Sequence, residues 1–238
     1  MLYLIGLGLN EKSFSFESFK ALKKCKKIYL EDYTSILNGD LKYLEELINK
    51  KIIKVDRDFV ENYDPLEAKK DNVAFLIIGD VFSATTHISM FNDCKNKNVD
   101  VRVFNNASII TAVGITGLEI YKFGKVASIP FENKNVEGPI KILNDNSKIN
   151  AHTLFLLDLD PSKNKFLSIK DAIEYLEKEG FNGNVVGCAR LGSENFVVKY
   201  GSMDEIKNAN FGKGPYCLIV PAKKLHFIEE EVLEKWKI

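Results

Sequence analysis

The chain has 238 residues, of which 45% are hydrophobic and 28% are charged, and its 33 basic residues balance its 33 acidic ones. These values are typical of a globular protein with one large domain or two small ones, and they give no indication of a nucleic-acid or membrane partner. Residues 1–5 lack the basic region of a signal peptide, and no apolar stretch is long enough to span a bilayer. We therefore expect a cytoplasmic protein.

Cysteine and histidine residues are spread along the sequence without the spacing of a redox motif or a metal site. Free thiols in a reducing compartment and the absence of a bound metal are the expectations that follow. The residues concerned are Cys25, Cys94, Cys188, Cys217, His87, His152 and His226.

Short apolar runs alternate with amphipathic segments, which is the pattern of an α/β fold. We predict strands at 2–9, 27–31, 52–55, 73–78, 101–104, 126–129, 153–159, 185–189, 196–200 and 216–220. Helical spacing of apolar residues predicts helices at 16–26, 41–48, 86–95, 169–177 and 228–236.

Near-continuous apolar strands in the first half indicate a parallel sheet that is covered on both faces. Closer spacing from 185 to 220 indicates an antiparallel ladder, and the polar stretch 132–150 reads as an exposed helix with loops. The expected architecture is therefore two α/β domains, 1–114 and 115–238, with a ligand cleft between them.

Two glycines, Gly6 and Gly8, follow the first predicted strand and allow a tight turn and a close approach of the backbone to a ligand. They invite a dinucleotide-binding interpretation, with Glu31 or Asp32 as the acid that binds the ribose. That motif needs a third glycine at position 11, where this chain has Glu11. A glycine-lined ligand site of another kind is favoured, and a purely structural turn stays open.

Two of the predicted strands end in small polar residues. These residues are Gly79-Asp80 with Ser83 after the strand at 73–78, and Asn105-Asn106 with Ser108 after the strand at 101–104. The carboxyl ends of parallel strands share one edge of an open sheet, where ligands bind. Asp80 could accept hydrogen bonds from a ribose there or balance a cation, although a role as helix cap is an equally good interpretation.

Two later segments, 152–158 and 188–193, each combine a buried strand with a charged residue near its end. Either segment could line a ligand site or form an ordinary strand and hairpin.

This set of motifs resembles the tetrapyrrole methylase superfamily and, within it, the family of diphthine synthases. The segments that carry the resemblance are Tyr33-Thr34-Ser35, Gly79-Asp80 with Ala84-Thr85-Thr86-His87, 112–118 with 120–124, His152-Thr153-Leu154 with Leu157-Asp158, Ala189-Arg190 with Gly192-Ser193, and Ile219-Val220-Pro221 with Leu225-His226. The match extends from Leu2 to about Glu229. It implies two α/β domains that hold S-adenosylmethionine in a cleft between them, in a homodimer.

The resemblance also implies which residues contact the cofactor: Leu9, Asp80, Ser83, Ser108, Ile109, Leu157, Leu191 and Tyr216. Val81, Ser83, Asn105 and Tyr216 depart from the usual residues of the family at these positions.

The activity that the resemblance implies is transfer of three methyl groups to the amino group of a 3-amino-3-carboxypropyl chain on a histidine of translation elongation factor 2. Arg190 is then the first candidate to bind the substrate carboxylate, and Lys122 is the second. His87 could serve as a general base, and Tyr33 could provide an aromatic wall for a quaternary ammonium.

Two other functions stay open at the level of sequence. The first is a methyltransferase of the same superfamily that acts on a tetrapyrrole such as a corrinoid precursor. The second is a protein without catalytic activity that binds S-adenosylmethionine or the elongation factor.

Overall fold

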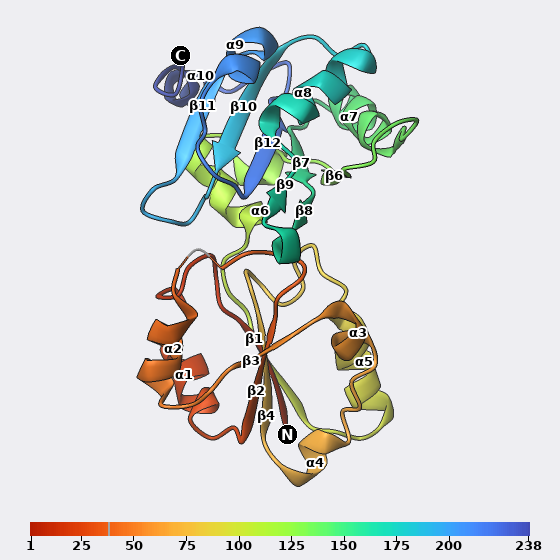
Figure 1. The fold of residues 1–238 in the computed structure, drawn as a ribbon. Coiled ribbons are helices and arrows are strands. Elements are labelled where there is room, and N and C mark those ends of the chain that lie inside the picture. Colours follow the sequence, from red (N-terminus) through yellow and green to blue (C-terminus); the bar gives the residue numbers. More distant parts are fainter. Residues whose placement is uncertain (38) are drawn as a thin grey trace. The chain divides into compact units, whose positions relative to one another are not determined.

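A computed structural model describes residues 1–37 and 39–238 and divides them into two units, Met1–Ile110 and Thr111–Ile238 (Figure 1). No helix among these residues has the length and apolar character needed to cross a membrane.

The first unit is built on a parallel sheet with the strand order β3-β2-β4-β1-β5. Its strands are β1 (Leu2–Gly6), β2 (Lys27–Glu31), β3 (Ile53–Val55), β4 (Val73–Ile77) and β5 (Val101–Phe104). Every neighbouring pair is parallel, which confirms the prediction for this half of the chain. The carboxyl ends of β1, β4 and β5 therefore lie at one edge of the sheet.

Helices cover both faces of this sheet, with α1 and α2 on one side and α3 and α5 on the other (Figure 1). The helices are α1 (Phe16–Leu22), α2 (Leu41–Ile48), α3 (Arg57–Glu61), α4 (Glu67–Lys70) and α5 (Ile88–Asn96). Side chains of β1 point alternately to the two faces, so Tyr3 and Ile5 join one apolar core while Leu2 and Leu4 join the other. Burial on both faces explains why the strand reads as a continuous apolar run.

The second unit contains a mixed sheet with the strand order β11-β10-β12-β7-β6 and a small hairpin of β8 and β9. The strands are β6 (Ala127–Ile129), β7 (Thr153–Leu157), β8 (Leu159–Asp160), β9 (Lys165–Phe166), β10 (Asn184–Ala189), β11 (Val197–Ser202) and β12 (Tyr216–Val220). Strands β10, β11 and β12 form the predicted antiparallel ladder, which is thereby confirmed. β12 also pairs antiparallel with β7, whereas β6 pairs parallel with it.

Helices α7, α8 and α9 contribute to the apolar core on one face of this sheet. The helical elements are α6 (Ile109–Ala112), η1 (Val113–Thr116), η2 (Ile120–Lys122), α7 (Gly138–Lys148), η3 (Pro161–Lys163), α8 (Ile169–Lys178), α9 (Met203–Asn208) and α10 (Phe227–Glu234). The predicted helix within 132–150 is confirmed as α7, and the four cysteines are free and buried, as expected.

All ten predicted strands are present, and most of their ends differ by only a few residues. β1 stops at Gly6, short of the predicted Leu9, because Gly8 turns the backbone with φ +73°. α9 was not predicted, although its capping box was readable: Ser202 accepts a hydrogen bond from the Glu205 N–H, and the Glu205 side chain accepts one from Ser202 N–H. Its six residues are too short for apolar periodicity to stand out.

Candidate functional site

The backbones of Gly8 and Gly79 pair with each other at the carboxyl edge of the first unit's sheet. Gly8 N–H donates to the Gly79 carbonyl at 3.0 Å, and Gly79 N–H donates to the Gly8 carbonyl at 2.8 Å. Both residues have positive φ, +73° and +89°, a conformation that favours glycine. A Cβ atom on Gly6 would lie only 2.7 Å from the Gly79 carbonyl oxygen. The edge is therefore made of closely packed backbone.

Asp80 joins the ends of β4 and β5. Its Oδ2 accepts hydrogen bonds from Asn105 Nδ2 and Asn106 N, both at 3.0 Å, and its Oδ1 accepts from Phe82 N at 3.0 Å and Ser83 Oγ at 3.1 Å. Burial acts to raise the pKa of Asp80, but these hydrogen bonds outweigh it and hold the pKa below its usual value. The four bonds match the acceptor capacity of a carboxylate, so Asp80 organises this edge as a charged group.

The other predicted residues of the first unit lie at the same edge. Ser108 is buried, and its Oγ accepts a hydrogen bond from Ile110 N at 3.2 Å. Its Cβ would lie 3.8 Å from a Cβ built on Gly79, so the two residues are neighbours. Leu9 follows the Gly8 turn and Ile109 begins α6, and both are half-buried. The structure thus brings all five of these positions together.

Asn106 was named with the polar residues of this strand end, but it was not among the predicted cofactor contacts. Its Nδ2 donates to the carbonyls of Gly6 and Ser13, both at 3.0 Å, and its backbone N–H donates to Asp80. One side chain therefore links the ends of β1 and β5 to the loop after Gly8. The signal was present as a pair of asparagines directly after a buried strand, where an amide can satisfy orphan carbonyl groups.

The three predicted residues of the second unit lie at one edge of the mixed sheet. Ala189 of β10 pairs with Tyr216, and the register of β12 with β7 places Leu157 beside that position. Leu191 follows two residues after the end of β10 and is buried. The Tyr216 hydroxyl donates to the Gly212 carbonyl, and burial raises the pKa of Tyr216 while nearby Arg190 opposes the shift.

The guanidinium of Arg190 donates hydrogen bonds to backbone carbonyls of neighbouring loops. Its Nε and Nη2 donate to the Asn195 carbonyl at 3.1 and 2.9 Å, and its Nη1 donates to the carbonyls of Phe211 (2.9 Å) and Lys213. These bonds use four of the five N–H groups of the guanidinium. The backbone of Arg190 is itself left-handed, with φ +50°. Binding of a substrate carboxylate by Arg190 stays a prediction, beside this structural role.

His87 stands at the N-terminus of α5 and is only 1% exposed. Its Nε2 lies 3.6 Å from Oε2 of Glu31, which is the last residue of β2 and is fully buried. Burial lowers the pKa of His87, and the Glu31 carboxyl opposes that shift. Glu31 therefore faces a histidine and is not placed to bind a ribose.

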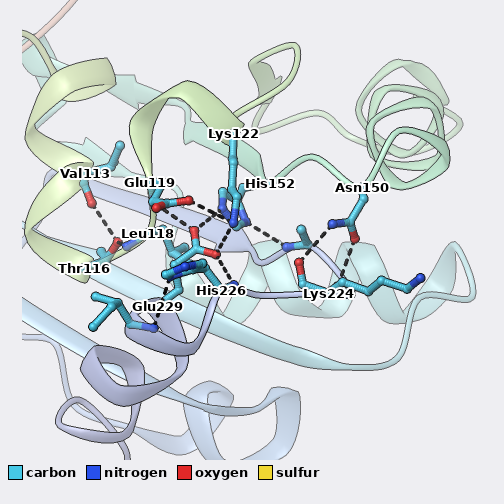
Figure 2. Close-up of polar contacts among 12 residues, drawn as sticks. Val113, Thr116, Leu118, Glu119, Lys122, Asn150, His152, Lys224, His226 and Glu229 are labelled. Atoms are coloured by element: carbon cyan, nitrogen blue, oxygen red, sulfur yellow. Dashed lines mark hydrogen bonds and ion pairs between the residues drawn. The ribbon is translucent and has the colours of Figure 1, made fainter.

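Lys122, the second candidate for the substrate carboxylate, belongs to a buried network in the second unit (Figure 2). Its Nζ lies 2.7 Å from Glu229 and 2.9 Å from Glu119. Glu229 also accepts hydrogen bonds from Glu119 N and His152 Nε2, both at 2.9 Å, and from His226 N at 2.8 Å. Lys122, His152 and His226 come from segments that carry the family resemblance, and here all three bind Glu229.

A cavity of about 470 Å³ lies in the second unit at the opposite end of the mixed sheet. It is lined by parts of α7, the loop 179–184 and residues 220–223, and it includes none of the predicted site residues. Over the described ranges 1–37 and 39–238, no group of three or more His, Cys, Asp or Glu side chains is arranged to hold a metal ion.

Comparison with known proteins identifies the family of the chain. A model of the family described as Tetrapyrrole (Corrin/Porphyrin) Methylases matches residues 1–207. A diphthine synthase from Methanosphaera stadtmanae is 38% identical over an alignment of 249 residues that covers 98% of this chain and 94% of that protein. A protein from Arabidopsis thaliana named "Probable diphthine methyl ester synthase" is 37% identical over 273 residues, covering 100% of this chain and 98% of the relative.

A crystal structure of diphthine synthase superposes with a TM-score of 0.92 at 34% identity, covering 99% of this chain and 95% of that one. Family model, relatives and solved structure thus agree over nearly the full length. The chain belongs to the tetrapyrrole methylase family and, within it, to the diphthine synthases.

Proposed function

We propose that the protein is an S-adenosylmethionine-dependent N-methyltransferase that trimethylates the amino group of the 3-amino-3-carboxypropyl histidine of translation elongation factor 2. The observation that carries this proposal is the match to diphthine synthases over 98% of the chain, in sequence and in fold. The same match favours this substrate over a tetrapyrrole. By the same family resemblance we propose a homodimer that works in the cytoplasm, where its protein substrate works.

The carboxyl edge of the first unit is the part of this unit that we propose to bind S-adenosylmethionine. A Cβ built on Gly79 would make only ordinary van der Waals contacts, the nearest of them with Ser108 at 3.8 Å. Polar groups of Asp80, Ser83 and Ser108 and the half-buried side chains of Leu9 and Ile109 surround it. We propose these residues, with Leu157, Leu191 and Tyr216, as the cofactor contacts. The bound cofactor supplies an electrophilic methyl group on a sulfonium.

The chain has to position the acceptor amine and accept its proton. The thioether that leaves is neutral, so no covalent nucleophile is required, and in-line orientation is the main contribution of the protein. An amine with a pKa of roughly 8 loses its proton at modest cost near neutral pH. We propose His87 as the proton acceptor, because burial keeps its imidazole neutral. Arg190 is the proposed partner of the substrate carboxylate.

Intact-mass analysis tests this function. Elongation factor 2 that carries the aminocarboxypropyl histidine is incubated with the protein and S-adenosylmethionine, and we expect three successive gains of one methyl group. Asp80→Ala should abolish them, because it removes the carboxylate that joins the strand ends, whereas Asp93→Ala, at an exposed position, should not. A fourth gain would indicate an additional methyl ester, as the name of the Arabidopsis relative suggests for that protein. No gain in the presence of bound cofactor would refute the proposed substrate.

A further inference from the structure

Three side chains near the carboxyl end of β2 carry buried polar atoms that have no hydrogen-bond partner among the described residues. These atoms are Glu31 Oε2, the Tyr33 hydroxyl and both ring nitrogens of His87. Glu31 and His87 are 0% and 1% exposed. Buried polar atoms are paired in the great majority of cases, so this cluster requires an explanation.

The orientation of Glu31 is fixed by the turn that follows it. Its Oε1 accepts hydrogen bonds from Thr34 N at 2.7 Å, Thr34 Oγ1 at 2.5 Å and Tyr33 N at 3.4 Å. The second oxygen, Oε2, is left for His87, whose Nε2 lies 3.6 Å away. This distance is slightly longer than a hydrogen bond, so a small approach or one bridging water would complete the contact.

The charges around the pair determine which nitrogen of His87 carries the proton. Glu31 is the charged group that acts on His87, while burial lowers the pKa of the imidazole and keeps it neutral. Burial raises the pKa of Tyr33 to about 12, and the carboxylates of Glu31 and Glu61 act in the same direction. Arg57, whose guanidinium lies 5.1 Å from the centre of the Tyr33 ring, opposes this shift. A neutral imidazole has one donor and one acceptor nitrogen. With Glu31 accepting from Nε2–H, Nδ1 is the nitrogen that can take up a proton.

We infer that Glu31 is the positioning residue of His87, which it holds in the Nε2–H tautomer so that Nδ1 accepts the proton released by the methyl acceptor. The inference rests on the proposed function. In each transfer the amine lone pair forms the new N–C bond and the electrons of the C–S bond pass to sulfur. Before each transfer the acceptor ammonium has lost a proton, which moves through water to Nδ1 of His87 and from there to solvent; the quaternary ammonium formed in the third transfer carries no N–H proton.

The place of His87 in the chain supports this role. It follows Asp80 by seven residues on the segment that leaves the same strand end. Thr86 and Ile88, on either side of it in the chain, are exposed, so His87 is a buried residue between two surface residues. Ala84 in this segment has φ +59°, a strained conformation that is often found at functional sites.

Nitrogen-15 NMR of the imidazole rings tests the pairing without any substrate. The chain has only three histidines, and His87→Gln identifies the signals of His87 by their loss. We expect the Nε2–H tautomer in the wild type. In Glu31→Gln the pKa of His87 should fall, because the carboxylate no longer stabilises the imidazolium, and the two tautomers should mix. If Glu31→Gln does not fold, Glu31→Asp, which withdraws the oxygen, should also mix the tautomers. An Nδ1–H tautomer, or no response to these changes, would overturn the inference.

Rates of methyl transfer between pH 6 and 9 test the consequence. We expect His87→Gln to lower kcat about 100-fold and Glu31→Gln about 10-fold at unchanged KM, as for loss or weakening of a general base. The acidic limb of the kcat profile should move to lower pH in Glu31→Gln, which a purely structural effect would not cause. Glu46→Gln, on the exposed side of α2, is the matched control with wild-type rates.

The outcomes separate the two proposals. An active wild type, with normal rates and an unshifted acidic limb in both variants, would overturn the inference and the proposed role of His87 and leave the proposed methyl transfer standing. A wild type that does not methylate the elongation factor at all would refute the proposed function, and the proton-acceptor role with it. The reduced rates and shifted limb, together with the NMR result, would support both.

Discussion

At Gly6 the backbone of the site leaves no space for a side chain. A Cβ atom there would lie 2.7 Å from the Gly79 carbonyl and 3.1 Å from Cβ of Asn106. We expect Gly6→Ala to destabilise the protein by about 1–3 kcal/mol, the usual cost of overpacking, and to weaken S-adenosylmethionine binding at least about 10-fold. Urea unfolding and titration calorimetry measure the two effects. Gly138→Ala is the control, because nothing lies within 4 Å of its Cβ and stability should be unchanged or slightly higher. Wild-type affinity in Gly6→Ala would contradict the proposed location of the site.

Single residues also show where sequence reasoning reaches its limit. Strand ends and small polar residues were sufficient to place Asp80 and Ser108 at one edge, because parallel strands share their carboxyl ends. Two partners of Arg190, Phe211 and Lys213, could not be predicted, since they lie more than twenty residues away and only the tertiary fold brings them near. The same holds for Glu31, whose pairing with His87 depends on β2 lying beside β4.

Glu229 connects α10 to His152, directly before β7, and to Lys122 of η2 (Figure 2). His152 Nδ1 accepts a hydrogen bond from Ala222 N at 2.8 Å, so the Nε2 of this buried neutral ring carries the proton that it donates to Glu229. Burial acts to raise the pKa of Glu229, but bonds from Lys122, the backbone and His152 lower it to about 2. The whole network is satisfied internally, which indicates a structural role for it.

The pH dependence of stability should show the contribution of Glu229. A carboxyl whose pKa is depressed in the folded state stabilises the protein fully above its unfolded pKa, roughly 4.3, and this contribution is lost as the pH falls towards 2. Glu229→Gln leaves Lys122 without its buried partner, and we expect it to cost about 3 kcal/mol at pH 7. Urea unfolding at several pH values should also show a weaker loss of stability between pH 5 and 2 than in the wild type. Glu230→Gln, an exposed position on the same helix, should behave as wild type. An unchanged acid dependence in Glu229→Gln would rule out this network as its source.

At the level of elements, the apolar runs predicted each strand of the two main sheets, because a strand covered on both faces is apolar throughout. The strand orders β3-β2-β4-β1-β5 and β11-β10-β12-β7-β6 were beyond prediction, since they depend on pairings between distant segments. Short elements such as α3, α4 and α9 were missed for another reason. They contain too few residues for a helical period to be recognised, and their caps are the better signal: Asp56 caps α3 as Ser202 caps α9.

At the scale of the whole molecule, each unit has apolar cores of its own, two in Met1–Ile110 and one in Thr111–Ile238. The contacts described for Gly6 and for Glu229 lie within their own units. Substitutions without shared partners usually have additive effects on the free energy of unfolding. We therefore expect Gly6→Ala to speed amide hydrogen exchange mainly in residues 1–110, and Glu229→Gln mainly in residues 111–238.

Hydrogen exchange measured by mass spectrometry of peptides tests this division, with the double variant as the decisive sample. Its free energy of unfolding should equal the sum of the two single effects within about 0.5 kcal/mol. Because S-adenosylmethionine is proposed to contact the carboxyl edge of the first sheet, adding it at 100 times its Kd should stabilise that edge by up to about 2.7 kcal/mol and slow exchange around Gly8, Gly79 and Asp80. Gly6→Ala should lose this protection, whereas Glu229→Gln should retain it. Equal loss of this protection in both variants would mean that cofactor binding depends on the network around Glu229. The proposed cofactor contacts would then have to include that network.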